Sequence, residues 1–305
     1  MRILFAGTPL TAANVLEGLI SAGHEIAAVL TREDSPVGRK KVLTPSAVAH
    51  VAEVHGLPTI KSNKVNSEVL VGISKHQIDL AIVVAYGVIL RRDALDTIHK
   101  GWFNLHFSKL PRWRGAAPVQ HAIWSGDKET AVTLFKIDEG LDTGAVLGFA
   151  ETVIEPNETS GDLLERLSSI GVTLLNQELP KLYAGTFSLS EQQGSVTLAP
   201  KIQRVDARID FISTSKEVEN LVRAMNPEPM AWCELAGDPL RVLKARAVKG
   251  VFAIAPGEVV VQDDLVLVGC GSESALELIE VQPASKTPMS AKSWMNGQSA
   301  KVVLE

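Results

Sequence analysis

The sequence predicts an α/β protein in which a Rossmann-like domain with a parallel sheet is followed by a smaller, OB-like β-barrel domain. Three observations lead to this fold class. The 305 residues exceed what one ordinary domain needs. Apolar runs alternate with helical patterns up to residue 188, whereas short apolar runs at close spacing dominate after residue 206. We therefore expect domains at 1–188 and 207–305, joined by a linker at 189–206.

The first domain is expected to alternate strands and helices. In chain order these are a strand at 3–6, a helix at 12–20, a strand at 26–30, a helix at 46–55, and strands at 80–85 and 103–106. The run at 80–85 contains no polar residue, which is typical of a parallel strand buried on both faces. This alternation predicts helices on both faces of the sheet.

The end of the first domain does not continue this alternation of strands and helices. Two apolar runs, at 132–137 and 146–154, flank a turn-rich segment, and they predict an antiparallel pair at the edge of the sheet. Residues 159–182 repeat leucine and isoleucine at helical spacing and predict one long helix.

The second domain opens with a helix. Thr214 and Glu217 form a capping box, and the apolar stripe that follows ends at Asn226-Pro227. Asp263-Asp264 is expected to be a tight turn between two strands. The short strands are predicted at 231–235, 240–247, 257–261, 265–269 and 276–281. Their number and length indicate a closed or partly closed barrel.

Composition excludes several classes of protein. No stretch reaches the ~18 apolar residues of a membrane helix, and the apolar start is too short for a secretory signal, so we expect a cytoplasmic protein without a membrane segment. Cys233 and Cys270 have no spacing for zinc or for a disulfide framework, and no metal is expected. The net charge of -5 does not favour a polyanion partner, so any such contact must be local.

The richest candidate site lies in the predicted strand at 103–106 and the loop after it. Ligands of open parallel sheets bind beyond the carboxyl ends of the strands, where Asn104 and His106 are expected. Residues two apart on a strand point the same way, so the amide and the imidazole can converge on one substrate atom. An amide that stabilises negative charge beside an imidazole that moves a proton suits acyl transfer. The alternative is that both side chains only satisfy loop backbone groups.

Asp142 is the third candidate, in a loop bounded by Gly140 and Gly144. Glycines let the chain bring a carboxylate close to an imidazole without steric cost. Such a carboxylate raises the pKa of the imidazole and fixes its orientation. A turn-capping aspartate is the alternative interpretation.

Two further loops are candidates for ligand contacts. The long connection at 31–45 carries Arg39, Lys40 and Lys41, which suits a lid or a phosphate-binding arm but equally a solvated loop. The segment 86–90 is apolar directly after a strand, which suits a pocket for a flat heterocycle or packing against a helix. The first turn, at 7–9, lacks the later glycines of a dinucleotide fingerprint, which argues against a nicotinamide or flavin site.

Together these stretches resemble the formyltransferase family that uses 10-formyltetrahydrofolate, and within it the branch that acts on methionine carried by initiator tRNA. The resemblance covers nearly the whole chain. In the first domain it is strongest at FAGTP (5–9), VVAYGVIL (83–90), NLHFSKLPRWRGAAPVQ (104–120) and LDTG (141–144). In the second part it continues at LAPKI (198–202), DARIDF (206–211), RAMNPEPMAW (223–232) and QPASKTPMSA (282–291).

The resemblance implies transfer of the formyl group of 10-formyltetrahydrofolate, a co-substrate, to the α-amino group of methionyl initiator tRNA for translation initiation. It implies that Asn104, His106 and Asp142 are the catalytic residues. It further implies that Arg39, Lys40 and Lys41 reach the tRNA, with the barrel helping to hold it. The implied folate contacts are Tyr86, Gly87, Val88, Leu90, Ser108, Lys109, Leu110 and Pro111. A monomer is expected.

The chain departs from the family pattern at a few positions. Lys109 stands where the family usually has leucine, which leaves the role of that side chain open, and its ammonium would suit the glutamate of folate. Two alternatives remain. One is a related folate-dependent enzyme that acts on an amino sugar or a ribonucleotide amine, or that hydrolyses the formyl group. The other is an RNA-binding protein with a decayed catalytic domain, which the intact trio disfavours.

Overall fold

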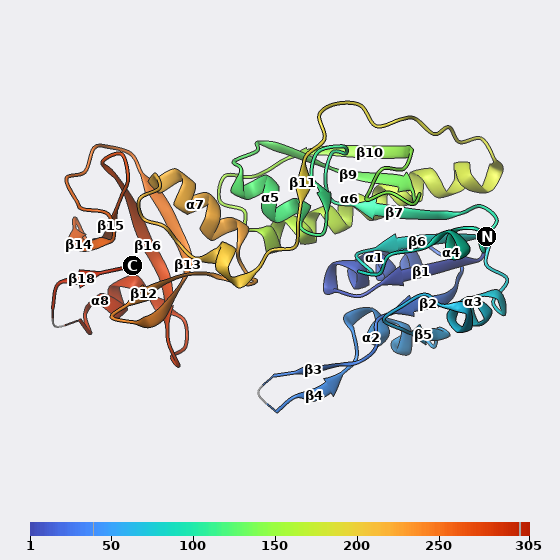
Figure 1. Ribbon diagram of the computed structural model, residues 1–305, viewed down its shortest axis with the longest axis horizontal. Helices are drawn as coiled ribbons and strands as arrows, with labels where there is room; N and C mark the ends of the chain where they lie inside the picture. Colours follow the sequence, from blue (N-terminus) through green and yellow to red (C-terminus); the bar gives the residue numbers. More distant parts are fainter. Residues whose placement is uncertain (39, 299) are drawn as a thin grey trace. The chain divides into compact units, whose positions relative to one another are not determined.

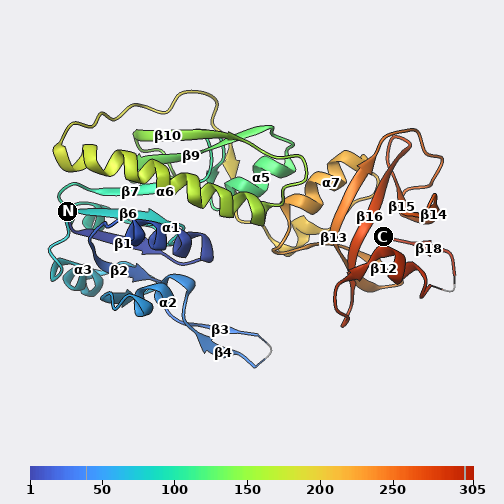
Figure 2. The ribbon, with the colours of Figure 1, turned by 180° about the vertical axis from the view of Figure 1, so that it is seen from behind.

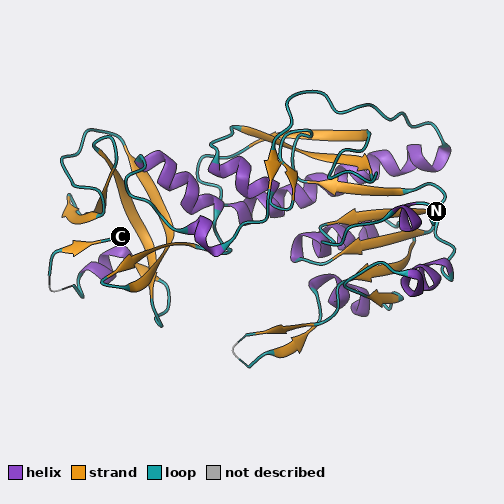
Figure 3. Cartoon of the chain, in the orientation of Figure 1, coloured by secondary structure: helices purple, strands orange, loops and turns teal. Residues whose placement is uncertain are grey.

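The computed structural model describes residues 1–38, 40–298 and 300–305. These residues form two compact units, each of which contains both helices and strands (Figure 3). The first unit comprises Met1–Pro118, Glu129–Val153 and Leu164–Ala199. The second unit comprises Val119–Lys128, Ile154–Leu163 and Pro200–Glu305.

A seven-stranded sheet forms the centre of the first unit (Figure 1). Its strands, in spatial order, are β10 (Val146–Val153), β9 (Glu129–Lys136), β7 (Trp102–His106), β6 (Leu80–Val84), β1 (Ile3–Gly7), β2 (Ile26–Thr31) and β5 (Thr59–Lys61). The strands from β5 to β7 are parallel neighbours, and β9 is antiparallel to both β7 and β10. The predicted parallel sheet with an antiparallel pair at its edge is confirmed.

Helices cover both faces of this sheet (Figure 2). On one face lie α1 (Leu10–Ser21), α2 (Ala47–Val54) and the long α6 (Ser160–Ala184). Close contacts join α6 to this face, because a Cβ added at Gly171 would lie 2.6 Å from Leu105 of β7. On the other face, α3 (Ser67–Ser74) and α4 (Arg92–Leu95) contribute Val69, Ile73 and Ala94 to the core.

The connection after β2 forms a hairpin that the sequence did not predict. β3 (Ser35–Val37) and β4 (Val42–Thr44) pair antiparallel, and the hairpin extends away from the sheet of its own unit (Figure 1). All six strand residues are exposed, so no alternation of buried and exposed positions marked them in the sequence.

The strand order reverses between β1 and β6. From β1 the chain proceeds to β2 and β5, and it then returns to β6 on the other side of β1. Thr8, after β1, donates a hydrogen bond from Oγ1 to the carbonyl oxygen of Tyr86, after β6, at 3.1 Å. In open α/β sheets, the crevice at such a reversal is where ligands bind. The next strand, β7, carries Asn104 and ends at His106.

The second unit contains an antiparallel sheet that curves into a barrel-like form. Its strands, in spatial order, are β12 (Ala231–Leu235), β13 (Asp238–Val248), β16 (Ser274–Pro283), β15 (Leu265–Cys270), β14 (Glu258–Gln262) and β18 (Val302–Val303), with β17 (Met289–Ser290) paired to β16. The end of the chain connects the two edges, since Glu305 exchanges backbone hydrogen bonds with Glu234 of β12 at 2.8 and 2.9 Å. The predicted turn at Asp263-Asp264 is confirmed, with φ of 48° and 64°.

Short helices complete the second unit. These are α5 (Pro118–Trp124), a 3₁₀ turn η1 (Arg204–Ala207), α7 (Ser215–Ala224) and α8 (Ala291–Met295). The capping box predicted at Thr214 and Glu217 begins α7, as expected. Among the described residues, no helix is long and apolar enough to cross a bilayer.

Candidate active site

His106, the last residue of β7, is 6% exposed. Its Nε2 lies 2.9 Å from the carbonyl oxygen of Trp113, and because a carbonyl only accepts, Nε2 carries the hydrogen. Nδ1 of the neutral ring therefore presents a lone pair. Burial lowers the pKa of His106, and this effect outweighs the charge of Asp142 and the Trp113 hydrogen bond, which raise it. The imidazole is thus neutral at pH 7 and able to accept a proton at Nδ1.

Asp142 faces that nitrogen. Its Oδ2 lies 3.7 Å from Nδ1 of His106, and its side chain is 14% exposed. The same oxygen accepts a hydrogen bond from the backbone N–H of Gly115 at 2.7 Å. The carboxylate is therefore oriented by the backbone and acts on the imidazole through its charge, at a distance longer than a hydrogen bond.

Asn104 lies two residues before His106 on the same face of β7. Its carboxamide oxygen is buried and accepts no hydrogen bond from the residues that the structure describes. A buried polar atom left in this way costs about 1–3 kcal/mol, and such atoms call for an explanation such as a ligand or a catalytic role. Phe135, the β9 partner of Asn104, packs edge-on against the His106 ring at 6.4 Å.

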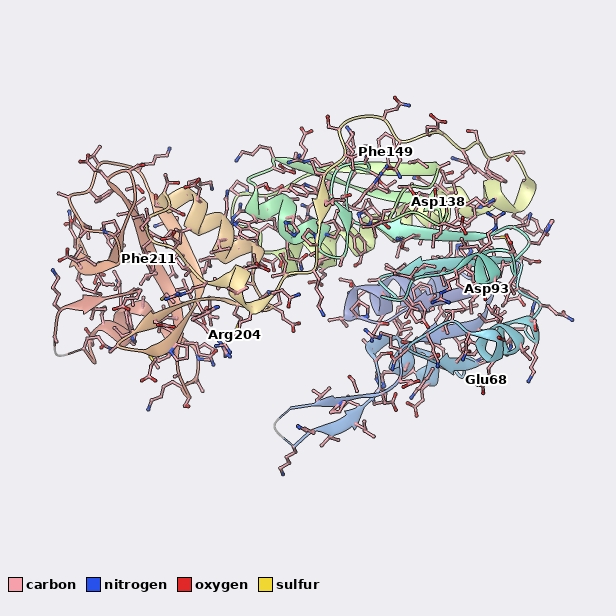
Figure 4. The ribbon with its side chains drawn as sticks, viewed as in Figure 1. Glu68, Asp93, Asp138, Phe149, Arg204 and Phe211 are labelled. Atoms are coloured by element: carbon pink, nitrogen blue, oxygen red, sulfur yellow. The ribbon has the colours of Figure 1, made fainter. Side chains whose placement is uncertain are left out.

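Hydrogen bonds within the loop that carries Asp142 stabilise its conformation. Asp138, labelled in Figure 4, accepts hydrogen bonds from the Gly140 N–H at 3.0 Å and from Thr143 Oγ1 at 2.6 Å. Gly144 passes so near β9 that an added Cβ would lie 1.7 Å from the carbonyl oxygen of Lys136. Asp142 itself has φ of 52°, in the left-handed region that aspartate tolerates better than most residues.

The segment 108–111 packs its side chains inward. Ser108 is fully buried and donates from Oγ to the carbonyl oxygen of Arg112 at 2.6 Å. Leu110 belongs to a small apolar cluster with Phe135, and Pro111 is also buried. The side chain of Lys109 lies on the surface and its ammonium forms an ion pair with Glu151 of β10. This contact raises the pKa of Lys109.

The segment 86–90 is also anchored in the core. Tyr86 is 1% exposed, and its hydroxyl donates to the carbonyl oxygen of Ser62 at 2.8 Å. Burial raises the pKa of Tyr86 to about 12. Leu90 and the partly buried Val88 join the same core cluster. Gly87 is exposed in this segment, and so is the side chain of Ile89, which is 86% exposed.

Two of the three basic residues predicted for tRNA lie at the tip of the hairpin β3–β4. Lys40 and Lys41 are exposed there, between the two strands. Arg39 lies outside the described residues. The structure thus brings His106 and Asp142 together and places Asn104 on the same strand as His106. The two lysines lie on a separate element of the same unit.

Residues from the segment predicted as a linker line this site, and sequence analysis missed them. Gln192 hydrogen-bonds to the carbonyl oxygens of Asp142 and Gly144. Thr197 accepts a hydrogen bond on Oγ1 from the Trp113 N–H at 2.9 Å. Next to it, β11 (Leu198–Ala199) pairs in parallel with β8 (Arg114–Gly115). Such contacts go to main-chain atoms of distant loops, so they leave no periodic pattern, and LAPKI at 198–202 was the one signal nearby.

Comparisons with known proteins find matches over both parts of the chain. A family model described as formyl transferase matches residues 1–179, and one described as formyl transferase, C-terminal domain, matches residues 201–299. A methionyl-tRNA formyltransferase of Arthrobacter sp. strain FB24 is 45% identical over 300 residues, which cover 98% of each chain.

Solved structures share the fold. An N-formyltransferase from Helicobacter canadensis, in complex with folinic acid and dTDP-3-aminofucose, has a TM-score of 0.70 at 20% identity, over 93% of this chain and 99% of its own. Methionyl-tRNA formyltransferase from Clostridium thermocellum has a TM-score of 0.58 at 17% identity, over 82% and 94% of the two chains. The chain therefore belongs to the formyltransferase family, in which its sequence relatives are methionyl-tRNA formyltransferases.

Proposed function

We propose that the protein transfers the formyl group of 10-formyltetrahydrofolate to the α-amino group of methionine on initiator tRNA. The observation that carries the proposal is a neutral, buried His106 beside Asp142 at the end of β7, in a chain of this family. The product is formylmethionyl-tRNA, which serves translation initiation. The enzyme acts in the cytoplasm as a monomer.

Asn104 stabilises the charge that develops on the formyl oxygen. As the amine attacks the formyl carbon, a new C–N bond forms and the carbonyl electron pair moves to oxygen. The N–H groups of the carboxamide donate to that oxyanion, and a donor of this kind contributes about 10²- to 10³-fold to kcat. The position of Asn104 on the same face of β7 as His106 supports this role, because it places the amide beside the group that moves the proton.

His106 moves the proton. Nδ1 accepts it from the attacking amine and the ring becomes an imidazolium, which the negative charge of Asp142 stabilises. The electron pair on the oxyanion then re-forms the C=O bond, and the bond between the formyl carbon and N10 of the folate breaks. N10 leaves with the electrons of that bond and takes the proton from the His106 imidazolium, so the imidazole returns to its neutral form.

The two substrates are proposed to meet at the reversal of strand order. The folate lies along 86–90 and 108–111, where the exposed backbone at Gly87 is available to it. Because Tyr86, Ser108 and Leu110 are buried, they shape this site from beneath. Lys40 and Lys41, together with Arg39, contact the tRNA backbone, and the second unit contributes to its binding.

A formylation assay with several acceptors tests the proposal. The acceptors are methionyl initiator tRNA, methionyl elongator tRNA and a set of amino sugars, each with 10-formyltetrahydrofolate, and mass spectrometry reads the product. We expect formylmethionine on initiator tRNA and none on the sugars. Product on the sugars alone would show that the acceptor is a sugar amine and not methionyl-tRNA. No product on any acceptor would refute formyl transfer.

A further inference from the structure

We propose that Gln192 is a positioning residue, which holds the carboxylate of Asp142 against His106 by clamping the Asp142 loop to Arg114. This inference rests on the proposed function and adds to it a residue from outside the two catalytic loops. Gln192, Arg114, Asp142 and Gly144 all belong to the first unit.

The carboxamide of Gln192 has a hydrogen-bond partner at each of its donor and acceptor positions. Nε2 donates to the carbonyl oxygens of Asp142 at 2.8 Å and Gly144 at 2.9 Å. Oε1 accepts from Nε of Arg114 at 3.1 Å and from Nη2 at 2.6 Å. Two donors and two acceptor sites are all that an amide offers, so the orientation of this side chain is fixed by its partners.

These bonds close a ring around the catalytic carboxylate. Gln192 binds the backbone of Asp142, the Asp142 carboxylate accepts from the Gly115 N–H, and Gly115 follows Arg114, which binds Gln192 again. One side chain therefore supports both the donor segment and the acceptor segment of the hydrogen bond that orients the carboxylate. Asp142 needs such support, because its backbone has the left-handed φ of 52° and lies in a loop between glycines.

The segment that carries Gln192 is anchored independently of it. Ser190 exchanges backbone hydrogen bonds with Val146 at 2.8 and 2.9 Å. On the other side, the carbonyl oxygen of Thr197 accepts from the Arg114 N–H at 2.9 Å. Gln192 is half-buried between these two anchors. Its truncation should therefore loosen the Asp142 loop while the segment and the core stay folded.

The expected consequence is a loss in kcat. A displacement of about 1 Å in a catalytic group can cost about 100-fold in rate. We expect Gln192→Ala to lower kcat about 10- to 100-fold and to leave the KM values for folate and tRNA within about threefold. Gln192→Glu keeps the acceptors for Arg114 and loses both donors to the loop, so it should lose kcat to a similar degree.

The matched control is Gln193→Ala, which removes the same side chain from the next, exposed position. The decisive measurement is a double-mutant cycle with Asp142→Asn. If Gln192 acts through the Asp142 carboxylate, Gln192→Ala should lower kcat less than about threefold once that carboxylate is absent. Equal factors in both backgrounds, or a kcat equal to that of Gln193→Ala, would overturn the proposal.

A second readout does not depend on activity. The Gly115 N–H, which is hydrogen-bonded to Asp142, should exchange its amide hydrogen at least about tenfold faster in Gln192→Ala, and at the normal rate in Gln193→Ala. Unchanged exchange would refute the clamp even if the protein formylated no acceptor. Conversely, faster exchange in a protein without formylation activity would retain the clamp and refute the proposed function alone.

Discussion

His106 experiences two opposing influences at a single ring. Burial disfavours the imidazolium, while Asp142 and the carbonyl of Trp113 favour it, and burial prevails, so that the pKa lies below the ordinary 6.5. The residue is thus a base at neutral pH whose protonated form has a counter-charge nearby. A general base needs this combination, since the proton must be accepted and then returned.

The pKa of His106 can be measured directly. An NMR titration of the histidine ring should give a midpoint below 6.5. In Asp142→Asn the midpoint should move to still lower pH, because the substitution removes a charge that raises the pKa. A midpoint above 6.5 in the wild type, or an upward shift in the variant, would contradict the balance described above.

Asn104 allows a nearly isosteric test. Asn104→Asp keeps the shape of the side chain, removes the N–H donors and adds a negative charge where the oxyanion forms. We expect kcat to fall at least about 100-fold, with folate affinity nearly unchanged. Initial rates and equilibrium folate binding measure the two quantities. A kcat within about fivefold of the wild type would show that the amide does not stabilise the transition state.

At the scale of elements, helix α7 shows how a local sequence signal becomes stability. Thr214 Oγ1 accepts a hydrogen bond from the Glu217 N–H, and the Glu217 carboxylate accepts from the N–H and the hydroxyl of Thr214, each at 2.8 Å. Thr214→Ala removes the cap and should lower the free energy of unfolding by about 1 kcal/mol. Urea denaturation checks this, with the exposed Lys249→Ala as the control. An unchanged midpoint would mean that tertiary contacts alone hold the first turn.

Elements were predictable where one physical signal dominated. The unbroken apolar run of β6, the capping box of α7 and the two aspartates of the β14–β15 turn each determine local structure without help from distant residues. The hairpin β3–β4 was not predictable, because its strand residues are all exposed and bury no apolar face. β18 has only two residues and depends on its pairing with β14.

The same distinction holds for the site. The placement of Asn104 and His106 on one face of a strand was predictable from the alternation of side chains along that strand. Asp142 was a weaker candidate from its loop alone, since a polar loop residue has many common roles, and the resemblance to a family supported its assignment. Gln192 could not be predicted, because its partners are main-chain carbonyl oxygens about fifty residues away in sequence and the side chain of Arg114, about eighty residues away.

At the scale of the whole molecule, the protein carries a net charge of -5 although its proposed substrate, tRNA, is a polyanion. Binding of tRNA must then rely on local groups such as Lys40 and Lys41. We expect the KM for tRNA to rise at least about tenfold between about 50 and 200 mM KCl, because binding releases cations from the phosphates and this release is less favourable at higher salt. The KM for folate should change less than about threefold. A tRNA KM independent of salt would contradict phosphate recognition by these lysines.

The most direct test of the central claim is a single-turnover measurement with 10-formyltetrahydrofolate that carries ¹³C in the formyl group. Wild type and His106→Ala are mixed with methionyl initiator tRNA at saturating concentrations, and label on the methionine α-nitrogen is followed by mass spectrometry. We predict transfer by the wild type and a rate at least about 100-fold lower in the variant. Absence of label on methionine in the wild type, or equal rates in the two proteins, would contradict the account.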